Sequence, residues 1–304
     1  MTHKAPIPVS VIGGFLGAGK TTLVNRLLSE NAGRRLGVIV NDFGEINIDE
    51  QLIVARDDDM VSLANGCICC SIGSDFLRAL VTLVTRPDPP EHIVIEASGV
   101  ADPMRIAALA RADKALSLFG IVVLVDACSF EAQRADPLLA DTLEEQVKSA
   151  DLLVLTKTDI SSPVETEAVT AALRTLVPEG RIAVSSVEAL PVGLLFNLGP
   201  RDDMRPAEHH HDHGFWSGSF ESAKSCDLDA LRAALGQVPA SVLRIKGFVR
   251  DAAGHRHTIQ WVGGRCEIRE NEASAPAGAA LVYIGVGAGA EAGEVERLLS
   301  PAFQ

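Results

Sequence analysis

The sequence predicts an α/β protein, in which a doubly wound, mostly parallel sheet precedes a smaller C-terminal α+β domain. Two observations predict this fold class. Up to about residue 195, continuous apolar runs alternate with helical stretches, which is the pattern of parallel strands covered on both faces. After residue 214, apolar and polar residues alternate instead, as in antiparallel strands with one solvated face. A chain of 304 residues is long enough for two such domains.

The predicted N-terminal domain, residues 1–195, opens with a short apolar strand that runs into a glycine-rich loop and then a helix. Further buried strands are expected at Leu36–Val40, Ile93–Ile95, Ile121–Val125, Leu152–Leu155 and Ile182–Val184. Helices such as Ser74–Val84 and Thr142–Ser149 separate them. Because doubly wound sheets bind their ligands beyond the carboxyl ends of the strands, we expect the functional site at that edge.

Residues 196–214 are rich in Pro, Gly, charge and His and show no hydrophobic period, so they are expected to form a linker. Residues 215–304 are then expected to form the α+β domain. Its predicted strands are Phe215–Phe220, Val242–Val249, His257–Val262 and Leu281–Ile284, and its predicted helices are Asp227–Leu235 and Glu291–Leu299. His255 and His257 are placed on a hairpin of this domain.

Composition and charge exclude two classes of partner. With 27 basic and 40 acidic residues the net charge is −13, which is unfavourable for sequence-independent binding to nucleic-acid phosphates. No apolar stretch approaches the roughly 20 residues that a membrane helix needs. The N-terminal apolar run lacks the shape of a signal peptide, so we expect a cytoplasmic protein that binds neither nucleic acid nor membrane.

Residues 14–21, GFLGAGKT, match the phosphate-binding pattern G-x-x-x-x-G-K-[ST] between a predicted strand and a predicted helix. The glycines allow backbone N–H groups to surround phosphates at the helix N-terminus. Lys20 is expected to reach the β- and γ-phosphates, and the Thr21 hydroxyl to bind Mg²⁺. The predicted nucleotide-binding residues of this loop are Gly14, Gly17, Ala18, Gly19, Lys20, Thr21 and Thr22.

A second phosphate-side element is the strand Ile93–Ile95 with the residues that follow it, Glu96-Ala97-Ser98-Gly99. Glu96 is expected to hold Mg²⁺ through water. Gly99 can approach the γ-phosphate because it lacks Cβ, and hydrolysis would release the loop Val100–Arg105. Lys20, Glu96 and Gly99 are therefore the candidate catalytic residues.

The apolar strand Leu152–Leu155 leads into Thr156-Lys157-Thr158-Asp159, which resembles a guanine-reading N/T-K-x-D loop. A carboxylate at Asp159 can accept hydrogen bonds from both N1–H and N2–H₂ of guanine, whereas adenine offers no such donor pair. The stem of Lys157 is expected to stack along the base, and Thr156 stands where Asn is usual. Ser185 and Ser186 are candidates for a further contact with the base.

Cys67, Cys69 and Cys70 form a C-x-C-C motif, which offers two or three thiolates to Zn²⁺ or a similar ion and leaves at least one position open. A disulfide between the adjacent Cys69 and Cys70 would be strained, and a redox sensor or three buried small residues remain the alternatives. Three further cysteines, Cys128, Cys226 and Cys266, are expected to be small buried residues.

Two other segments carry candidate metal-side residues. Asn41–Glu45 follows the second strand, so Glu45 is a candidate metal ligand whose position would depend on the nucleotide, and Asp42 and Glu45 are the candidates for activating water. An internal histidine run is expected to bind Zn²⁺, Ni²⁺ or Co²⁺ weakly, or to be a solvated linker without a role. Its members are His209, His210, His211 and His213.

Taken in order, GGFLGAGKTT, NDFGEINID, GCICC, IEASGVADP and TKTD resemble the CobW-type metallochaperone GTPases. The His-rich connector and the segment RIKGFV extend the resemblance over nearly the whole chain. The resemblance implies a GTPase domain related to nickel-insertion GTPases, a CobW C-terminal domain, and metal ligation by Cys69 with Cys67 or Cys70. Three positions depart from the family pattern, namely Asp42 for Glu, Ala97 for Thr and Thr156 for Asn.

The sequence therefore predicts an enzyme that hydrolyses GTP to GDP and phosphate with Mg²⁺. It is expected to couple this reaction to delivery of a transition metal, with Zn²⁺ favoured and Co²⁺ or Ni²⁺ as alternatives, to a metal-requiring client protein. A nucleotide-regulated metal buffer or sensor is the first alternative, and a P-loop kinase is the second. The client, the metal and the oligomeric state are not determined by the sequence.

Overall fold

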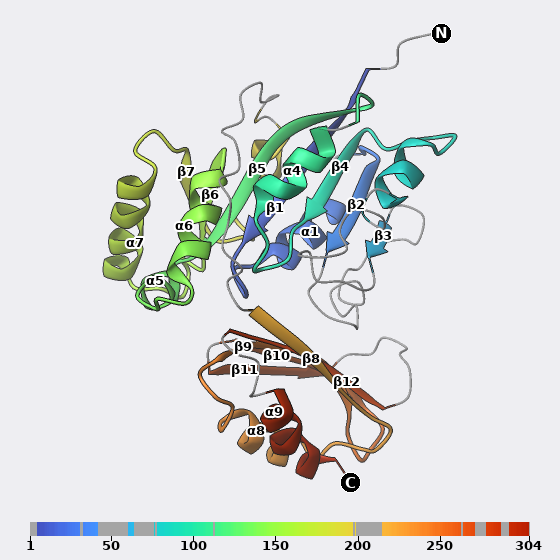
Figure 1. The fold of residues 1–304 in the computed structure, drawn as a ribbon, viewed down its shortest axis with the longest axis vertical. Coiled ribbons are helices and arrows are strands. Elements are labelled where there is room, and N and C mark those ends of the chain that lie inside the picture. The colour runs from blue at the N-terminus through green and yellow to red at the C-terminus, as the bar shows by residue number, and fades with distance from the viewer. Residues whose placement is uncertain are drawn as a thin grey trace. The chain divides into compact units, whose positions relative to one another are not determined.

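The computed structural model describes two compact units (Figure 1). The described residues of the first unit are 5–30, 33–41, 60–63, 76, 78–111, 113–196 and 198. Those of the second unit are 215–262, 264–270, 278–286 and 292–303.

The first unit is built on a seven-stranded sheet with the order β3-β2-β4-β1-β5-β6-β7. All its pairings among the described residues are parallel, which confirms the predicted fold class. The strands are β1 Ile7–Gly14, β2 Leu36–Asn41, β3 Met60–Leu63, β4 His92–Glu96, β5 Leu116–Asp126, β6 Leu152–Thr156 and β7 Ile182–Val184. Sequence analysis did not identify β3, because its four residues are too few to show a period.

Helices cover both faces of this sheet, and each face has its own apolar cluster. The helices are α1 Lys20–Ser29, α4 Pro103–Arg111, α5 Phe130–Arg134, α6 Ala140–Ser149, α7 Pro163–Leu176 and the short η1 Val192–Leu194, and residues 78–84 are also helical. On β1, Val9 and Val11 belong to one cluster and Ile12 to the other. This burial on both faces explains why the strands are continuous apolar runs.

The register of the parallel strands brings the predicted functional segments to one edge. Ile12 is paired with Glu96, so the phosphate loop after β1 and the acidic end of β4 are neighbours. On the other side of β1, Asp126 at the end of β5 is paired with Thr156 at the end of β6. Figure 1 shows β1, β4, β5 and β6 side by side at the centre of the sheet.

The expected loop Val100–Arg105 is wrong in its second half. Helix α4 begins at Pro103, so residues 103–105 are helical. The reason is a helix start that the pattern analysis overlooked: Asp102 Oδ1 accepts the backbone N–H of Met104 at 2.8 Å, and proline is well suited to the first helical position.

The second unit is a five-stranded antiparallel sheet with the order β11-β10-β9-β12-β8. Its strands are β8 Phe215–Ser222, β9 Val242–Arg250, β10 Arg256–Val262, β11 Arg265–Glu270 and β12 Ala279–Val286. Its helices α8 Leu228–Leu235 and α9 Ala292–Leu299 and the short η2 Ser300–Ala302 complete the apolar core around Leu231, Tyr283 and Val295. The predicted α+β character is confirmed, although the polar edge strand β11 was not predicted.

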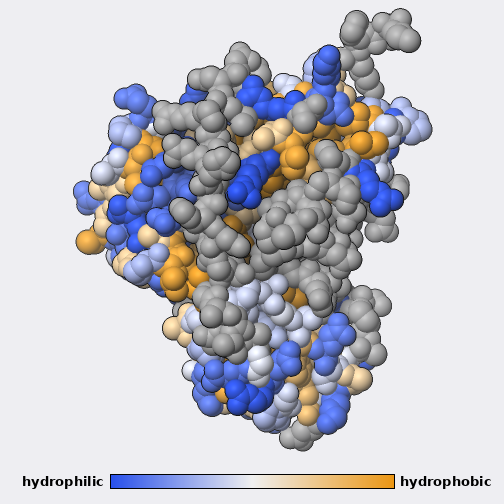
Figure 2. Space-filling view, in the orientation of Figure 1, coloured by the Kyte–Doolittle hydropathy of each residue, from blue (hydrophilic) through white to orange (hydrophobic). Residues whose placement is uncertain are grey.

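The described surface that faces the viewer in Figure 2 carries both polar and apolar residues. Figure 2 shows hydrophilic and hydrophobic residues interspersed on the described part of the face in view. Within the described ranges, no helix is long and apolar enough to cross a membrane.

Candidate nucleotide-binding site

The loop after β1 has the backbone shape that its glycines predict. Gly14, Gly17 and Gly19 have φ angles of 128°, 80° and 101°, a region that residues with a Cβ rarely adopt. At Gly14 a Cβ would lie 2.4 Å from the backbone oxygen of Leu124, so a larger residue has no space there. Gly19 then provides the N-cap of α1 and has no side chain that could compete with a ligand for the amides of the first turn.

Lys20 is folded back onto the loop that precedes it. Its Nζ donates to the carbonyl oxygens of Gly14 at 2.7 Å and Phe15 at 3.0 Å, and the residue is buried. An ammonium group thus lies directly against the loop that is predicted to bind phosphate. The group is therefore placed to attract phosphate oxygens.

Thr21 and Glu96 join the phosphate loop to the end of β4. The Thr21 hydroxyl donates to Glu96 Oε1 at 2.8 Å, and Glu96 is only 3% exposed. A hydroxyl and a carboxylate supply the hard oxygen donors that Mg²⁺ requires, so these two residues fit a magnesium ion that keeps several waters. The remaining residue predicted in this loop, Thr22, is exposed on the first turn of α1.

Gly99 lies directly against the phosphate loop. A Cβ at this position would be 2.4 Å from Leu16 Cδ2 and 3.0 Å from the backbone Cα of Leu16. Gln146 of α6 donates its Nε2 to the carbonyl oxygens of Gly99 at 3.1 Å and Ala101 at 2.9 Å. Sequence reasoning missed Gln146, because an isolated Gln in an amphipathic helix carries no signal of its own.

The end of β6 is fixed to the phosphate loop by its last residue, Thr156. Thr156 is fully buried, and its hydroxyl donates to the carbonyl oxygen of Ala18 at 2.9 Å and also lies 3.1 Å from that of Val125. Asp159 is exposed at the tip of the loop after β6. Ser185 and Ser186 lie beyond β7, where Ser185 Oγ donates to the carbonyl of Ser186 at 3.0 Å.

Lys157 forms an ion pair that the sequence did not predict. Its Nζ lies 2.6 Å from Oδ2 of Asp126, the last residue of β5. The side chain of Asp126 is 7% exposed and that of Lys157 is 30% exposed. A carboxylate at the end of a long apolar strand was the available signal, since buried charges in such places are paired or functional.

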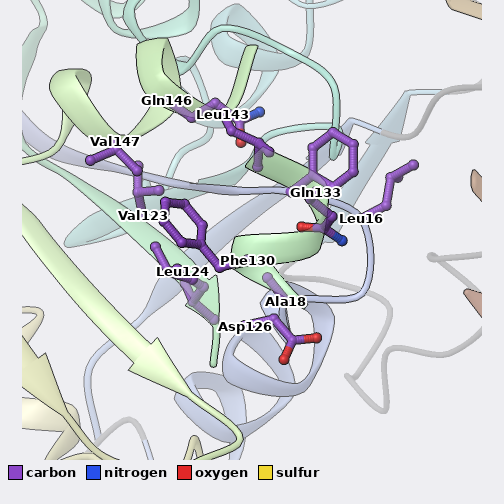
Figure 3. Close-up of a pocket in the computed structure, with 12 residues that line it drawn as sticks. Leu16, Ala18, Val123, Leu124, Asp126, Phe130, Gln133, Leu143, Gln146 and Val147 are labelled. Carbon is purple, nitrogen blue, oxygen red and sulfur yellow. The ribbon is translucent and has the colours of Figure 1, made fainter. Parts of the chain in front are cut away.

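A small cavity lies behind the phosphate loop. Its walls come from the loop, β5, α5 and α6, and Figure 3 shows Asp126 and Ala18 at one end and Gln146 at the other. Its volume of about 10 Å³ corresponds to roughly one water molecule. The nucleotide therefore belongs at the strand ends outside this cavity.

The predicted metal-side residues lie outside the described residues. This applies to Cys67, Cys69, Cys70, Glu45, Asp42, His209, His210, His211 and His213. Within the described ranges no group of three His, Cys, Asp or Glu side chains is arranged to hold a metal ion. Of the three separate cysteines only Cys226 is buried; the expectation was wrong for Cys128 and Cys266, which are partly exposed.

Comparison with protein families identifies both units. Residues 8–184 match the model of the CobW/HypB/UreG nucleotide-binding domain, and residues 215–302 match the cobalamin synthesis protein CobW C-terminal domain. The chain belongs to the CobW/HypB/UreG family of P-loop GTPases.

Two relatives that are similar in sequence agree with this membership. The chain is 33% identical over 313 residues to "Zinc chaperone CobW" of Sinorhizobium sp., covering 87% of this chain and 88% of the relative. It is 36% identical over 200 residues to "Zinc chaperone YjiA" of Escherichia coli, covering 63% of this chain and 61% of the relative. The crystal structure of zinc-bound YjiA GTPase from E. coli has 25% identity and a TM-score of 0.48, covering 99% of this chain and 100% of that chain.

Proposed function

We propose that this CobW-family chain is a GTP-hydrolysing metallochaperone that binds a transition metal, with zinc favoured, and transfers it to a client protein. The proposed metal ligands are Cys67, Cys69 and Cys70 with Glu45. In this proposal residues 1–195 form the GTPase domain, residues 196–214 a linker and residues 215–304 the C-terminal domain. The linker histidines would add a weak loading site.

One observation carries the nucleotide half of the proposal. The 2.8 Å hydrogen bond from Thr21 to Glu96 places a hydroxyl and a buried carboxylate together, immediately beside a lysine-bearing phosphate loop. Enzymes that hydrolyse nucleoside triphosphates need this combination of cation, hard oxygen ligands and inward-facing amides. The metal half is supported by the C-x-C-C sequence and by relatives named zinc chaperones and "Zinc-regulated GTPase metalloprotein activator 1".

The roles of the residues follow from their positions. Lys20 would donate to the β- and γ-phosphate oxygens, because an ammonium forms strong charge-assisted hydrogen bonds with phosphate. Thr21 and Glu96 would hold Mg²⁺, which neutralises charge on those oxygens when it is bound.

The sensing step is assigned to Gly99. The backbone N–H of Gly99 would sense the γ-phosphate, since Gly99 lies against Leu16 of the phosphate loop. Asp159 would read the guanine edge. Loss of the γ-phosphate would release the segment after Gly99 and change the surroundings of Glu45 and the thiolates, so that the metal passes to the client.

The experiment is zinc affinity, measured by competition with a chelating dye in the presence of GDP·Mg²⁺ or a non-hydrolysable GTP analogue. We expect the affinities in the two nucleotide states to differ by about tenfold, a coupling of roughly 1.4 kcal/mol. The double variant Cys69→Ala/Cys70→Ala should lose this difference. The control Cys266→Ala removes a partly exposed cysteine of the second unit, outside the motif, and should retain it.

Other results would favour the alternatives. Equal zinc affinities in both nucleotide states would contradict coupling and indicate a metal buffer or sensor. Phosphate recovered on an acceptor molecule instead of free in solution would indicate a kinase.

A further inference from the structure

We propose that Asp126 is a positioning residue for guanine recognition, which fixes the conformation of Lys157 and, through it, the direction of Asp159. This inference rests on the proposed function, because it assumes that the loop after β6 reads guanine. It adds a residue from a different strand, outside the T-K-x-D pattern, to the determinants of base specificity.

The backbone of Lys157 is the first observation. Its φ angle is 59°, and within the described ranges it is the one residue other than glycine with a positive φ. This left-handed conformation is unfavourable for a residue with a Cβ. A lysine that keeps it in place of glycine therefore needs a side-chain interaction that selects this conformation.

The ion pair with Asp126 is that interaction. The 2.6 Å separation of Nζ and Oδ2 is short even for a charge-assisted hydrogen bond. Because Asp126 is 7% exposed, water competes poorly for its carboxylate. Surface pairs are screened and contribute little, whereas a buried carboxylate that loses its partner is strongly unfavourable.

The same carboxylate also shapes the turn after its own strand. Its Oδ1 accepts the backbone N–H of Cys128 at 2.9 Å, while Oδ2 binds Lys157. Two more contacts connect the loops: the Ala127 amide donates to the Thr156 carbonyl at 3.1 Å, and Cys128 Sγ lies 3.9 Å from the Lys157 carbonyl. The loops after β5 and β6 are thus held together by the Asp126 carboxylate and by these two contacts beside it.

The position of Lys157 determines that of Asp159. The carbonyl oxygen of Lys157 accepts the amides of Ile160 at 3.2 Å and Ser161 at 3.0 Å, which closes a turn around Asp159. On the preceding side, Thr156 is bonded to Ala18 of the phosphate loop. Asp126 therefore sets the base-reading carboxylate relative to the phosphates before a nucleotide arrives. Figure 3 shows Asp126 beside Ala18.

The test is the Asp126→Asn variant, which keeps an oxygen for the Cys128 amide and removes the charge that pairs with Lys157. Its matched control is Asp136→Asn, because Asp136 Oδ1 also accepts the amide two residues on, that of Leu138, at 2.9 Å. Affinities for GDP and IDP are measured by fluorescence titration. IDP lacks the 2-amino group that Asp159 is proposed to bind, so the ratio of the two dissociation constants reports base reading.

We expect Asp126→Asn to weaken GDP binding by about 10- to 100-fold, the range for loss of a charged hydrogen bond. The preference for GDP over IDP should fall by several fold, and kcat at saturating GTP should stay within about twofold, since Lys20, Thr21 and Glu96 are unchanged. Asp136→Asn should match the wild type. Asp126→Glu, which restores the charge, should recover part of the preference and serves as the test if the Asn variant does not fold.

Three results would overturn the inference or its basis, and they are distinguishable. Unchanged GDP and IDP affinities in Asp126→Asn would show that the pair does not position the base. Equal weakening of both nucleotides with an unchanged ratio would show a purely structural role. A wild-type protein that does not bind guanine nucleotides would overturn the proposed function itself, before the variants are compared.

Discussion

At the scale of single residues, the site depends on backbone conformations and close contacts that are possible only where the side chain is absent or small. Gly14 and Gly33 both have positive φ angles, 128° and 80°, but their surroundings differ. A Cβ at Gly14 would meet the backbone of Leu124, whereas nothing lies within 4 Å of a Cβ at Gly33. Substitutions at these two glycines therefore compare the free-energy cost of a positive φ angle alone with the cost of a positive φ angle plus a close contact with Leu124.

We expect Gly33→Ala to lower the free energy of unfolding by only about 1–2 kcal/mol, the cost of a left-handed conformation. Gly14→Ala should cost clearly more and weaken GTP binding at least tenfold, because the loop must shift away from β5. Urea unfolding and nucleotide titration measure the two effects. Equal losses in both variants would show that the close approach to Leu124 is unimportant.

Thr156 shows how a residue-level departure is accommodated. In the sequence it stands where Asn is usual in the base-reading motif. In the structure its hydroxyl lies within hydrogen-bonding distance of two carbonyl oxygens, those of Ala18 and Val125, in a fully buried position. A shorter side chain with one hydroxyl is sufficient for holding the two loops together, since this contact uses backbone acceptors and no base atoms.

At the scale of elements, helix α6 contacts the switch segment, which is the turn that begins at Gly99 after β4. Gln146 is buried on this helix, and its side-chain amide donates to the carbonyl oxygens of Gly99 and Ala101. Because Leu16 also lies against Gly99, this turn contacts both the phosphate loop and a helix. Any movement of Gly99 toward a γ-phosphate must change these two hydrogen bonds.

We therefore expect Gln146→Leu to change GTP hydrolysis by about tenfold, since two buried carbonyls lose their partners at roughly 1–3 kcal/mol each. The free energy of unfolding should also fall. Gln133→Leu is the control, because Gln133 lines the same cavity from α5 but is partly exposed, and within the described ranges its side chain makes no hydrogen bond to residues 99–101. Single-turnover hydrolysis measures the effect, and identical rates in the two variants would contradict the role given to Gln146.

At the scale of the whole molecule, the two units have separate cores and separate responses to acid. His92 at the start of β4 is buried between Phe119 and Phe196 and lies 2.8 Å from Ser10 Oγ. Burial, with the nearby Arg34, lowers the pKa of His92 to about 4. In the second unit, the hydrogen bond from His257 is the main cause that lowers the pKa of Asp251 to about 2.

These pKa shifts predict that the two units lose stability over different pH ranges. His92 is neutral in the folded state and protonates more readily when unfolded, so its contribution is present above its usual pKa of 6.5 and is lost as the pH falls toward 4. The contribution of Asp251 is present above its usual pKa of 3.8 and is lost as the pH falls through about 2. Acidification to pH 5 should therefore destabilise the first unit before the second.

Urea unfolding at pH 7 and pH 5 tests this expectation. Between the usual pKa of 6.5 and pH 5, at 1.36 kcal/mol per pH unit, the free energy of unfolding of the wild-type first unit should fall by up to about 2 kcal/mol. The fall should be smaller in His92→Gln. Trp216 and Trp261, which are the only tryptophans, belong to the second unit, so their fluorescence midpoint should move less than the far-ultraviolet dichroism midpoint. A larger shift in fluorescence than in dichroism would contradict the assignment.

The sequence by itself determined the parallel and antiparallel classes of the two sheets, because burial on both faces or on one face leaves a direct pattern of apolar residues. It also placed Lys20 and Thr21 at the start of the first helix and Glu96 at the end of a strand, because these positions follow from local sequence patterns. Short or polar strands such as β3 and β11 escaped it, since four to six residues without a strong period do not distinguish a strand from a loop.

Only the tertiary structure decided the contacts between distant segments. Asp126 and Lys157 are 31 positions apart, and Gln146 and Gly99 are 47 positions apart, yet each pair is hydrogen-bonded. No local pattern encodes such pairs, because they depend on which strands are neighbours and in what register. The sequence thus determined which chemical groups this protein carries, and the order of strands in the sheet decided which of them act together.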